Sequence, residues 1–149
     1  MTGGSLAHQR IVLNLCFALM GLLGARPLVA VQEMRVQIGS RIRYPDVAVA
    51  AGPLDQNTRT LTDAMALFEV LSDDTATTDR VEKLIDYAAV PSLRVYVLLE
   101  QTAVAATLFQ REPGGEWIAS AHLGGELALP GLDIILPLTE LYRGLSFPA

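Results

Sequence analysis

Two segments of the chain have the hydrophobic pattern of helices. Residues 8–24 are apolar almost throughout, with Asn14 as an interruption, which predicts a helix buried on more than one side. We expect this helix to end at Gly24, because glycine tolerates the left-handed conformation that ends many helices. Residues 78–89 mix apolar and polar positions at helical spacing, which predicts an amphipathic helix that Pro91 ends. The apolar side of this helix comprises Val81, Leu84, Ile85 and Ala88.

Strands are predicted where apolar and polar residues alternate, or where a short apolar run lies between turn residues. Residues 28–38 alternate in this way and end at Gly39. Residues 46–50 form a short apolar run, and after a polar loop residues 65–71 form another, whose only charge is Glu69. Three more candidates are residues 93–100, 103–111 (also compatible with weak helix) and 117–123, and the tail predicts a short strand and a final helical turn.

The size and composition of the chain favour one intracellular domain. Its 149 residues are enough for a single core, so we expect one domain over residues 1–149. Cys16 is the only cysteine, which excludes a disulfide framework and a cysteine-based zinc site and fits a reducing cytoplasm. The net charge of −5 opposes loose binding along a polyanion, so any nucleic-acid role must depend on a local site.

The apolar run 11–25 follows Arg10 and has the length of the hydrophobic part of a signal peptide. We favour a buried helix, because a spanning helix needs ~20 apolar residues. Here Asn14 interrupts the run, and Arg26 and Pro27 close it. We therefore expect a cytoplasmic protein outside the membrane, with export or membrane anchoring as the alternative.

Lys83 is the only lysine in a chain that otherwise uses arginine, and an ammonium is a compact charge that a guanidinium does not replace. Asp46 lies early in one predicted strand and Glu69 near the end of another, so the three groups are able to meet at one sheet edge. Two carboxylates hold Mg²⁺ or Mn²⁺ through hard oxygen ligands. A lysine beside them orients a nucleophile or offsets phosphate charge. The three residues together are the set needed for metal-assisted phosphodiester hydrolysis.

Each of these residues also has a structural explanation. Asp46 suits a turn or the start of a strand, and Glu69 suits an ion pair with an arginine. Lys83 lies four residues after Asp79, the spacing of an ordinary surface pair on a helix. Asp79 and Glu82 also resemble an N-terminal capping arrangement.

Several weaker candidates surround this set. Tyr87 follows Lys83 by one helical turn and either reaches the site through its hydroxyl group or packs in the core. His8, at the start of the first helix, either meets a phosphate or metal, or it caps the helix or is solvated. Arg41 and Arg43 either contact phosphates or form a solvated edge. The chain has no glycine-rich phosphate loop, no Rossmann fingerprint and no base motif that would activate a serine.

Four strings, taken in order, carry a resemblance to a known family. They are Tyr44-Pro45-Asp46-Val47, Phe68-Glu69-Val70-Leu71-Ser72, Asp79 with Lys83 and Tyr87, and Arg94-Val95-Tyr96-Val97-Leu98. This ordered set resembles the Uma-two family of restriction endonucleases, within the PD-(D/E)xK nuclease superfamily. The resemblance runs from about His8 to the final Leu-Pro-Leu-Thr-Glu-Leu-Tyr, nearly the whole chain.

The resemblance implies an α/β fold, restriction-endonuclease-like, with a mixed β-sheet core flanked by helices. It also implies a divalent metal, DNA as the substrate and a homodimer. In the usual superfamily pattern the lysine follows the acidic residue by two positions, but residue 71 is leucine. The resemblance therefore implies that Lys83 supplies the lysine from the following helix, with Asp46 and Glu69 as catalytic metal ligands.

Two features depart from the family pattern. Members usually carry an acidic Glu-Leu-x-x-Gly segment whose glutamate joins the metal site, and this chain starts after it. Glu33 stands where the family commonly has aspartate, and its extra methylene moves the carboxylate. We keep Glu33, His8, Asp79 and Tyr87 as candidate supporting residues.

Our first expectation is a divalent-metal-dependent DNA endonuclease that hydrolyses phosphodiester bonds. The alternative is a member of the family without catalysis, acting as a dimeric binding or scaffold protein. The acidic charge and the shortened start favour this alternative.

Overall fold

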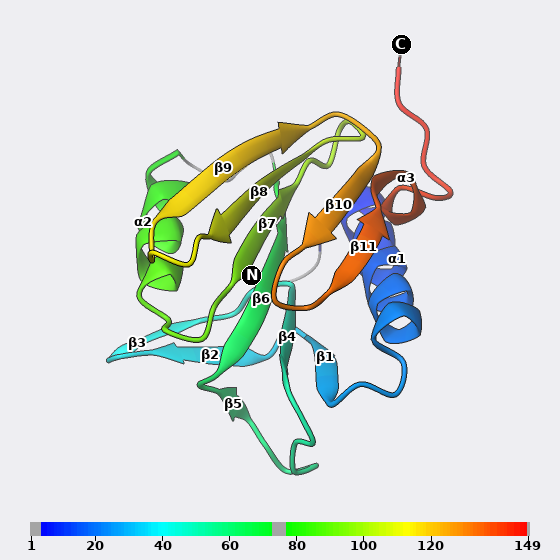
Figure 1. The fold of residues 1–149 in the computed structure, drawn as a ribbon. Helices are drawn as coiled ribbons and strands as arrows, with labels where there is room; N and C mark the ends of the chain where they lie inside the picture. Colours follow the sequence, from blue (N-terminus) through cyan, green and yellow to red (C-terminus); the bar gives the residue numbers. More distant parts are fainter. Residues whose placement is uncertain (1–3, 73–76, 149) are drawn as a thin grey trace.

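The computed structural model describes residues 4–72 and 77–148, with only the backbone described for residues 77–79. Its elements, in chain order, are α1 Leu6–Leu23, β1 Leu28–Gln32, β2 Arg35–Ile38, β3 Arg41–Arg43, β4 Val47–Ala51, β5 Thr60–Leu61, β6 Ala64–Val70, α2 Thr77–Ala88, β7 Val95–Leu99, β8 Ala106–Arg111, β9 Trp117–His122, β10 Glu126–Leu129, β11 Ile134–Pro137 and α3 Leu138–Leu141. The largest sheet has six strands in the order β1-β4-β6-β7-β8-β9 (Figure 1). Its β6–β7 pair is parallel and its other pairs are antiparallel.

This sheet separates two hydrophobic cores. On one face, α1, α3 and the β10–β11 hairpin pack against strand residues such as Phe68 and Val97. On the other face, α2 and the small β3-β2-β5 sheet pack against residues such as Leu67 and Tyr96. Figure 1 shows α2 on the side of the molecule away from α1. The predicted α/β fold, with a mixed sheet and flanking helices, is confirmed.

The first predicted helix is present as α1, but only one side of it is buried. Ile11, Leu15 and Leu19 are fully buried, whereas Phe17 is 77% and Met20 71% exposed. The expectation of burial on several sides is wrong, because the large sheet, β11 and α3 pack against one side of the helix and no described element covers the other. By length and composition, α1 is the one helix among the described residues that is able to cross a membrane.

The stretch predicted as one strand over residues 28–38 forms two. Glu33, between β1 and β2, has a φ of 53°, in the left-handed region that interrupts a strand. As a result, β1 pairs with β4 in the large sheet, whereas β2 pairs with β3 and β5. The β3 and β5 strands were not predicted, and the tail contains the β10–β11 hairpin where one strand was expected. The other predicted strands are present as β4, β6, β7, β8 and β9.

The second predicted helix is present as α2, but it turns a different side to the sheet. Tyr87 is fully buried and Asp86 is 7% exposed, whereas Val81 is 51% and Ile85 65% exposed. Val81 and Ile85 of the predicted apolar side therefore face outward, whereas Leu84 of the same side packs against the core. The physical reason is that the sheet presents the Glu69 carboxylate on this face, so polar side chains of α2 find partners there.

Candidate functional site

The paired ends of β4 and β6 bring two carboxylates together. Val47 pairs with Phe68 in the antiparallel register, and continuing this register by one residue places Asp46 opposite Glu69. Side chains alternate between the faces of a sheet, so Glu69 belongs to the face that α2 covers, whereas the Asp46 carboxylate lies at the end of the strand pair, between the Val70 N–H and His8 of α1. The ladder ends here, and Oδ2 of Asp46 accepts a hydrogen bond from the Val70 N–H at 2.8 Å.

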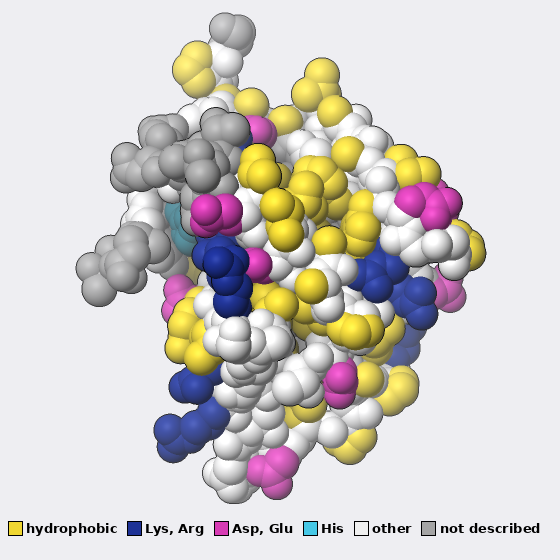
Figure 2. All heavy atoms as spheres, turned by 90° about the vertical axis from the view of Figure 1, so that its left-hand side faces the viewer, with side chains coloured by type: hydrophobic (Ala, Val, Ile, Leu, Met, Phe, Trp, Pro, Cys, Tyr) yellow, Lys and Arg dark blue, Asp and Glu magenta, His cyan; other side chains and the backbone are white. Residues whose placement is uncertain are grey.

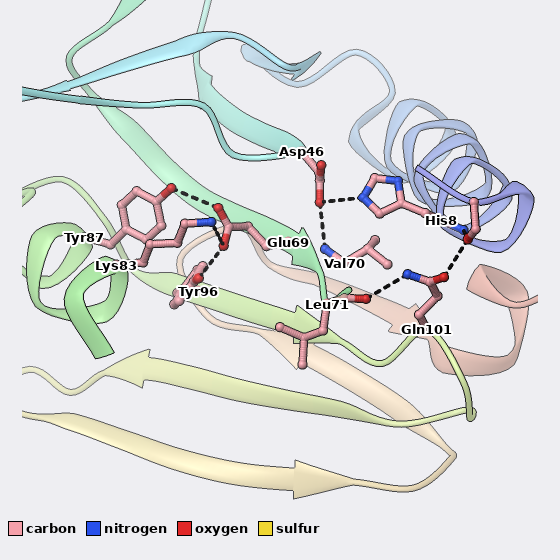
Figure 3. A network of polar contacts seen from close by, with 10 residues as sticks. His8, Asp46, Glu69, Val70, Leu71, Lys83, Tyr87, Tyr96 and Gln101 are labelled. Atoms are coloured by element: carbon pink, nitrogen blue, oxygen red, sulfur yellow. Dashed lines mark hydrogen bonds and ion pairs between the residues drawn. The ribbon is translucent and has the colours of Figure 1, made fainter. Parts of the chain in front are cut away.

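Glu69 is a buried carboxylate enclosed by hydroxyl groups and one ammonium group (Figure 3). Its Oε1 accepts a hydrogen bond from the Tyr87 hydroxyl at 3.1 Å, and its Oε2 accepts one from the Tyr96 hydroxyl at 2.8 Å. Burial raises the pKa of Glu69, while the positive charge of Lys83 and the two hydroxyl donors act to lower it; the net shift is upward. The negative charge of Asp46 adds to the rise.

Lys83 extends from α2 to the same face of the sheet as Glu69. Its Nζ lies 3.5 Å from Oε2 of Glu69, and its side chain keeps 25% exposure. The ammonium therefore contacts the carboxylate, while the side chain as a whole keeps partial access to solvent. A group in this position is able to interact with a water molecule or phosphate that approaches Glu69.

The two tyrosines are fixed by their packing. Their rings meet edge to face with centroids 4.9 Å apart, and Tyr96 also stacks on Phe109 at 5.9 Å. Burial raises the pKa of Tyr87, and the negative charge of Glu69 and the hydrogen bond to it raise it further. Tyr87 therefore remains a protonated donor that holds the carboxylate in place.

His8 of α1 contacts the Asp46 carboxylate on the side away from Glu69 (Figure 3). Its Nε2 lies 3.4 Å from Oδ2 of Asp46, and the residue is only 9% exposed. Its Nδ1 is buried and makes no hydrogen bond among the described residues. Ser5 positions the start of α1 by accepting a hydrogen bond from the His8 N–H, and Gly4 packs on the ring so closely that a Cβ there would lie 2.7 Å from its Cγ.

Two other predicted residues do not reach the carboxylates. The side chain of Asp79 lies outside the described residues. The backbone N–H of Glu33 donates to the carbonyl oxygen of Asp46 at 3.0 Å, so its backbone borders the site. Its side chain is exposed, however, and makes no hydrogen bond or ion pair with a described residue.

Arg41 and Arg43 are joined to α2 by Asp86. Nη1 of Arg41 donates to Oδ1 of Asp86 at 2.8 Å, and Nε and Nη2 of Arg43 contact Oδ2 at 2.9 and 2.7 Å. Desolvation acts to raise the pKa of Asp86, but the hydrogen bonds and positive charges of Arg43 and Arg41 outweigh it, so the pKa is lowered. This cluster connects the β2–β3 hairpin to the helix that carries Lys83.

Sequence reasoning missed Tyr96, Asp86 and Gln101. Tyr96 was noted as part of a string, but its hydroxyl is a partner of Glu69 because β7 pairs with β6 in parallel. A tyrosine between valines in a core strand was the available signal. Gln101 bridges α1 to the end of β6, since its amide accepts from the Ser5 hydroxyl at 2.5 Å and donates to the Leu71 carbonyl at 3.0 Å. No sequence pattern pointed to it.

The two carboxylates fit a hard divalent cation by their chemistry. Each carboxylate oxygen has more than one acceptor position, so Glu69 is able to bind a cation while it accepts the tyrosine hydroxyls. Asp46 keeps 21% of its side chain exposed, and its Oδ1 accepts no hydrogen bond from a described residue. Among the side chains that the structure describes, which leave out that of Asp79, no three His, Cys, Asp or Glu residues gather as a metal site. A donor set of two carboxylates suits Mg²⁺, which usually keeps waters and substrate phosphates as its other ligands.

Comparison with known proteins identifies the family. The model of the Uma2 (Uma-two) family, described as "Putative restriction endonuclease", matches residues 1–141. Two curated proteins from Synechocystis sp. (strain ATCC 27184 / PCC 6803 / Kazusa) are similar. "Uncharacterized protein slr1290" is 31% identical over 99% of this chain and 80% of its own length, and "Uncharacterized protein sll1609" is 28% identical over 83% and 73%.

A solved structure has the same fold. It is the crystal structure of "a putative nuclease belonging to DUF820 from Anabaena variabilis ATCC 29413", with a TM-score of 0.75 and 17% sequence identity over 95% of this chain and 82% of that chain. The likeness shows a restriction-endonuclease-like fold, in which a mixed sheet carries helices on both faces. The chain belongs to the Uma2 family of nuclease-like proteins.

Proposed function

We propose that this protein is a divalent-metal-dependent DNA endonuclease that uses Asp46, Glu69 and Lys83. One observation carries the proposal: the Lys83 ammonium lies 3.5 Å from a buried carboxylate that stands opposite Asp46 at the end of a strand pair. The family description and the nuclease-like fold support the same reaction class.

The side chains have separate roles in this proposal. Asp46 and Glu69 bind Mg²⁺ or Mn²⁺, which, when bound, lowers the pKa of a coordinated water and polarises the phosphodiester. Lys83 orients the attacking water and offsets the negative charge of the phosphate. The tyrosine hydroxyls and His8 act on the carboxylates rather than on the substrate, by fixing their orientation.

Plasmid nicking in Mn²⁺ or Mg²⁺ tests the proposal. We expect the wild-type chain to nick supercoiled DNA and to lose this activity in EDTA. Glu69→Gln and Lys83→Ala should each reduce the rate at least about 100-fold, the scale measured when one stabilising donor is removed from an active site. Glu126→Gln, which changes an exposed carboxylate on β10, is the matched control and should nick at the wild-type rate.

Metal binding gives a readout that does not depend on cleavage. A cation that binds only the folded chain raises its melting temperature, by an amount equivalent to about 2.7 kcal/mol at a concentration 100 times the dissociation constant. Mn²⁺ should stabilise the wild-type chain and Glu126→Gln, but not Glu69→Gln. Absence of both nicking and metal-linked stabilisation in the wild-type chain would contradict the proposal.

A binding or scaffold protein without catalysis is the second candidate function. The observation that favours it is that the described residues supply only two carboxylates to the site, with no third metal ligand. This candidate predicts a folded protein with no nicking in either metal. DNA binding measured in EDTA would then show whether it recognises nucleic acid.

We also propose that the protein acts as a homodimer in the cytoplasm. The exposed apolar side chains of α1, which include Phe17 and Met20, support a partner surface on this helix. Cell fractionation tests the location, because export or membrane anchoring through α1 would place the protein outside the cytoplasmic fraction.

A further inference from the structure

The β2–β3 hairpin is the most basic short segment of an acidic chain. Residues 34–45 contain Arg35, Arg41 and Arg43 and no aspartate or glutamate, although the whole chain carries a net charge of −5. Figure 2, which shows the side of the molecule that lies to the left in Figure 1, displays Lys and Arg side chains in separate groups rather than as one continuous patch. Positive charge is thus placed locally, as a specific contact to a polyanion requires.

The hairpin adjoins the proposed site directly. After β3 the chain runs through Tyr44 and Pro45 into Asp46, so the arginines of β3 lie within a few residues of a proposed metal ligand. Figure 1 shows the hairpin projecting beyond the large sheet, below α2. A polymer that reaches Asp46 and continues along this side of the molecule therefore meets the hairpin.

Asp86 holds two of these arginines in fixed positions. Its side chain is 8% exposed and contacts the guanidinium groups of both Arg41 and Arg43. The side chain of Arg43 is only 22% exposed, but that of Arg41 remains 61% exposed. Asp86 thus fixes the Arg41 guanidinium group on one side, and Arg41 presents its positive charge to solvent on the other.

An exposed aromatic residue, Tyr44, follows Arg43 in the chain. Tyr44 is 62% exposed, unlike Tyr87 and Tyr96, which are buried. Exposed aromatic rings interleaved with arginines are typical of surfaces that contact nucleic-acid backbones and bases. In the chain, Tyr44 lies between the arginines and Asp46. It is therefore able to contact the same nucleic-acid strand as they do.

We propose that the β2–β3 hairpin is a nucleic-acid-binding arm, in which Arg41, held by Asp86, contacts a backbone phosphate and Tyr44 contacts the adjoining nucleotide. This proposal rests on the proposed function, since it gives the substrate of that same site a path across the protein. It assigns Arg41 and Tyr44 to substrate binding, whereas the reaction itself is assigned to other residues.

The test is the salt dependence of DNA binding without cleavage. Fluorescence anisotropy with a labelled duplex in EDTA, and separately in Ca²⁺, gives the dissociation constant over a series of NaCl concentrations. Arg41→Gln removes one phosphate contact, so the slope of log affinity against log salt should fall by about 1. At ~0.1 M salt this corresponds to about eightfold weaker binding. Arg41→Lys should retain most of the affinity, and Tyr44→Ala should weaken binding with little change in slope.

Arg143→Gln is the matched control. Arg143 is 66% exposed and is also paired with one carboxylate, that of Glu140, but it follows α3 on the other side of the molecule (Figure 1). It should bind with the wild-type affinity and slope. Circular dichroism and melting temperature confirm that every variant is folded.

DNA binding by Arg41→Gln and nicking by the wild-type chain together distinguish a failure of the arm from a failure of the endonuclease. An unchanged affinity and slope in Arg41→Gln would overturn the arm, whether or not the wild-type chain nicks DNA. Absence of duplex binding by the wild-type chain would overturn it as well. Binding that depends on Arg41 in a chain that does not nick DNA would support the arm and reject the endonuclease.

Discussion

At the scale of single residues, the environment of Glu69 determines what the site is able to do. A buried carboxylate is costly unless it is paired or hydrogen-bonded, and Glu69 has an ammonium and two hydroxyl donors around it. These groups hold the two oxygens in fixed directions. Orientation of this kind is what partners of a metal ligand usually provide.

Loss of one hydroxyl donor should weaken metal binding. We expect Tyr96→Phe to lower Mn²⁺ affinity about 10- to 100-fold, the usual effect of removing a group that orients a ligand. Calorimetric titration measures the affinity. Tyr142→Phe is the control, because the Tyr142 hydroxyl also donates within the core, but to the carbonyl oxygens of Glu100 and Ala105. If Tyr96→Phe and Tyr142→Phe bind Mn²⁺ equally well, the role assigned to Tyr96 is wrong.

Asp86 gives a prediction about pH. Its pKa in the folded state is lowered, so its contribution to stability is present above the unfolded value of about 3.9 and is lost as the pH falls through the lowered folded value. Asp86→Asn should therefore reduce the free energy of unfolding by about 1–3 kcal/mol at pH 7. The difference from the wild-type chain should disappear in strong acid. Urea denaturation at pH 7 and in strong acid, below the lowered folded value, measures both differences, and a constant difference would contradict the assignment.

At the scale of elements, α1 has two sides with different roles. Leu15 is fully buried, so Leu15→Ala should cost about 2–5 kcal/mol of unfolding free energy. Phe17 is 77% exposed, so Phe17→Ala should change stability by less than about 0.5 kcal/mol in the monomer. Thermal denaturation at low protein concentration compares the two. Equal destabilisation would mean that the exposed side of α1 is covered in solution.

The helices also show why the site needs elements far apart in the chain. α1 brings His8 to Asp46, α2 brings Lys83 and Tyr87 to Glu69, and the sheet joins the two carboxylates. Gln101 ties the start of α1 to the end of β6 through its two hydrogen bonds. A shift of either helix would therefore change the site without altering a ligand.

At the scale of the whole molecule, the exposed side of α1 gives a prediction about assembly. A stable interface removes about 800 Å² from each partner, and its centre is usually apolar. Phe17→Glu should therefore convert the proposed homodimer to a monomer in analytical ultracentrifugation. Ile85→Glu, which places the same charge on the exposed side of α2, should leave the dimer intact. A dimer that survives Phe17→Glu would locate the interface elsewhere.

The net charge of −5 acts at the same scale. It opposes general binding to DNA, so the proposed binding would depend on local groups such as Arg41 and on cations that reduce repulsion near Asp46 and Glu69. In the proposed function, the metal and the hairpin would each lower the electrostatic cost of bringing a phosphate to an acidic protein.

The sequence by itself determined the helices and most strands, because hydrophobic periodicity reflects which residues face a core. It also singled out Asp46, Glu69 and Lys83, since charged groups beside apolar strands and a sole lysine stand out in any reading; their catalytic roles stay predictions. It did not reveal the break at Glu33, because apolar and polar residues continue to alternate across this position. The left-handed backbone of Glu33 separates β1 from β2, and the two strands pair in different sheets.

Only the tertiary structure decided which groups surround those residues. The face of α2 that meets the sheet was predicted only in part, because Lys83, Asp86 and Tyr87 gain partners there that are distant in the chain. Tyr96 reaches Glu69 through the pairing of parallel strands, and Arg41 and Arg43 reach Asp86 across more than forty residues. Such contacts depend on how elements pack, and local hydrophobic patterns carry no information about partners of this kind.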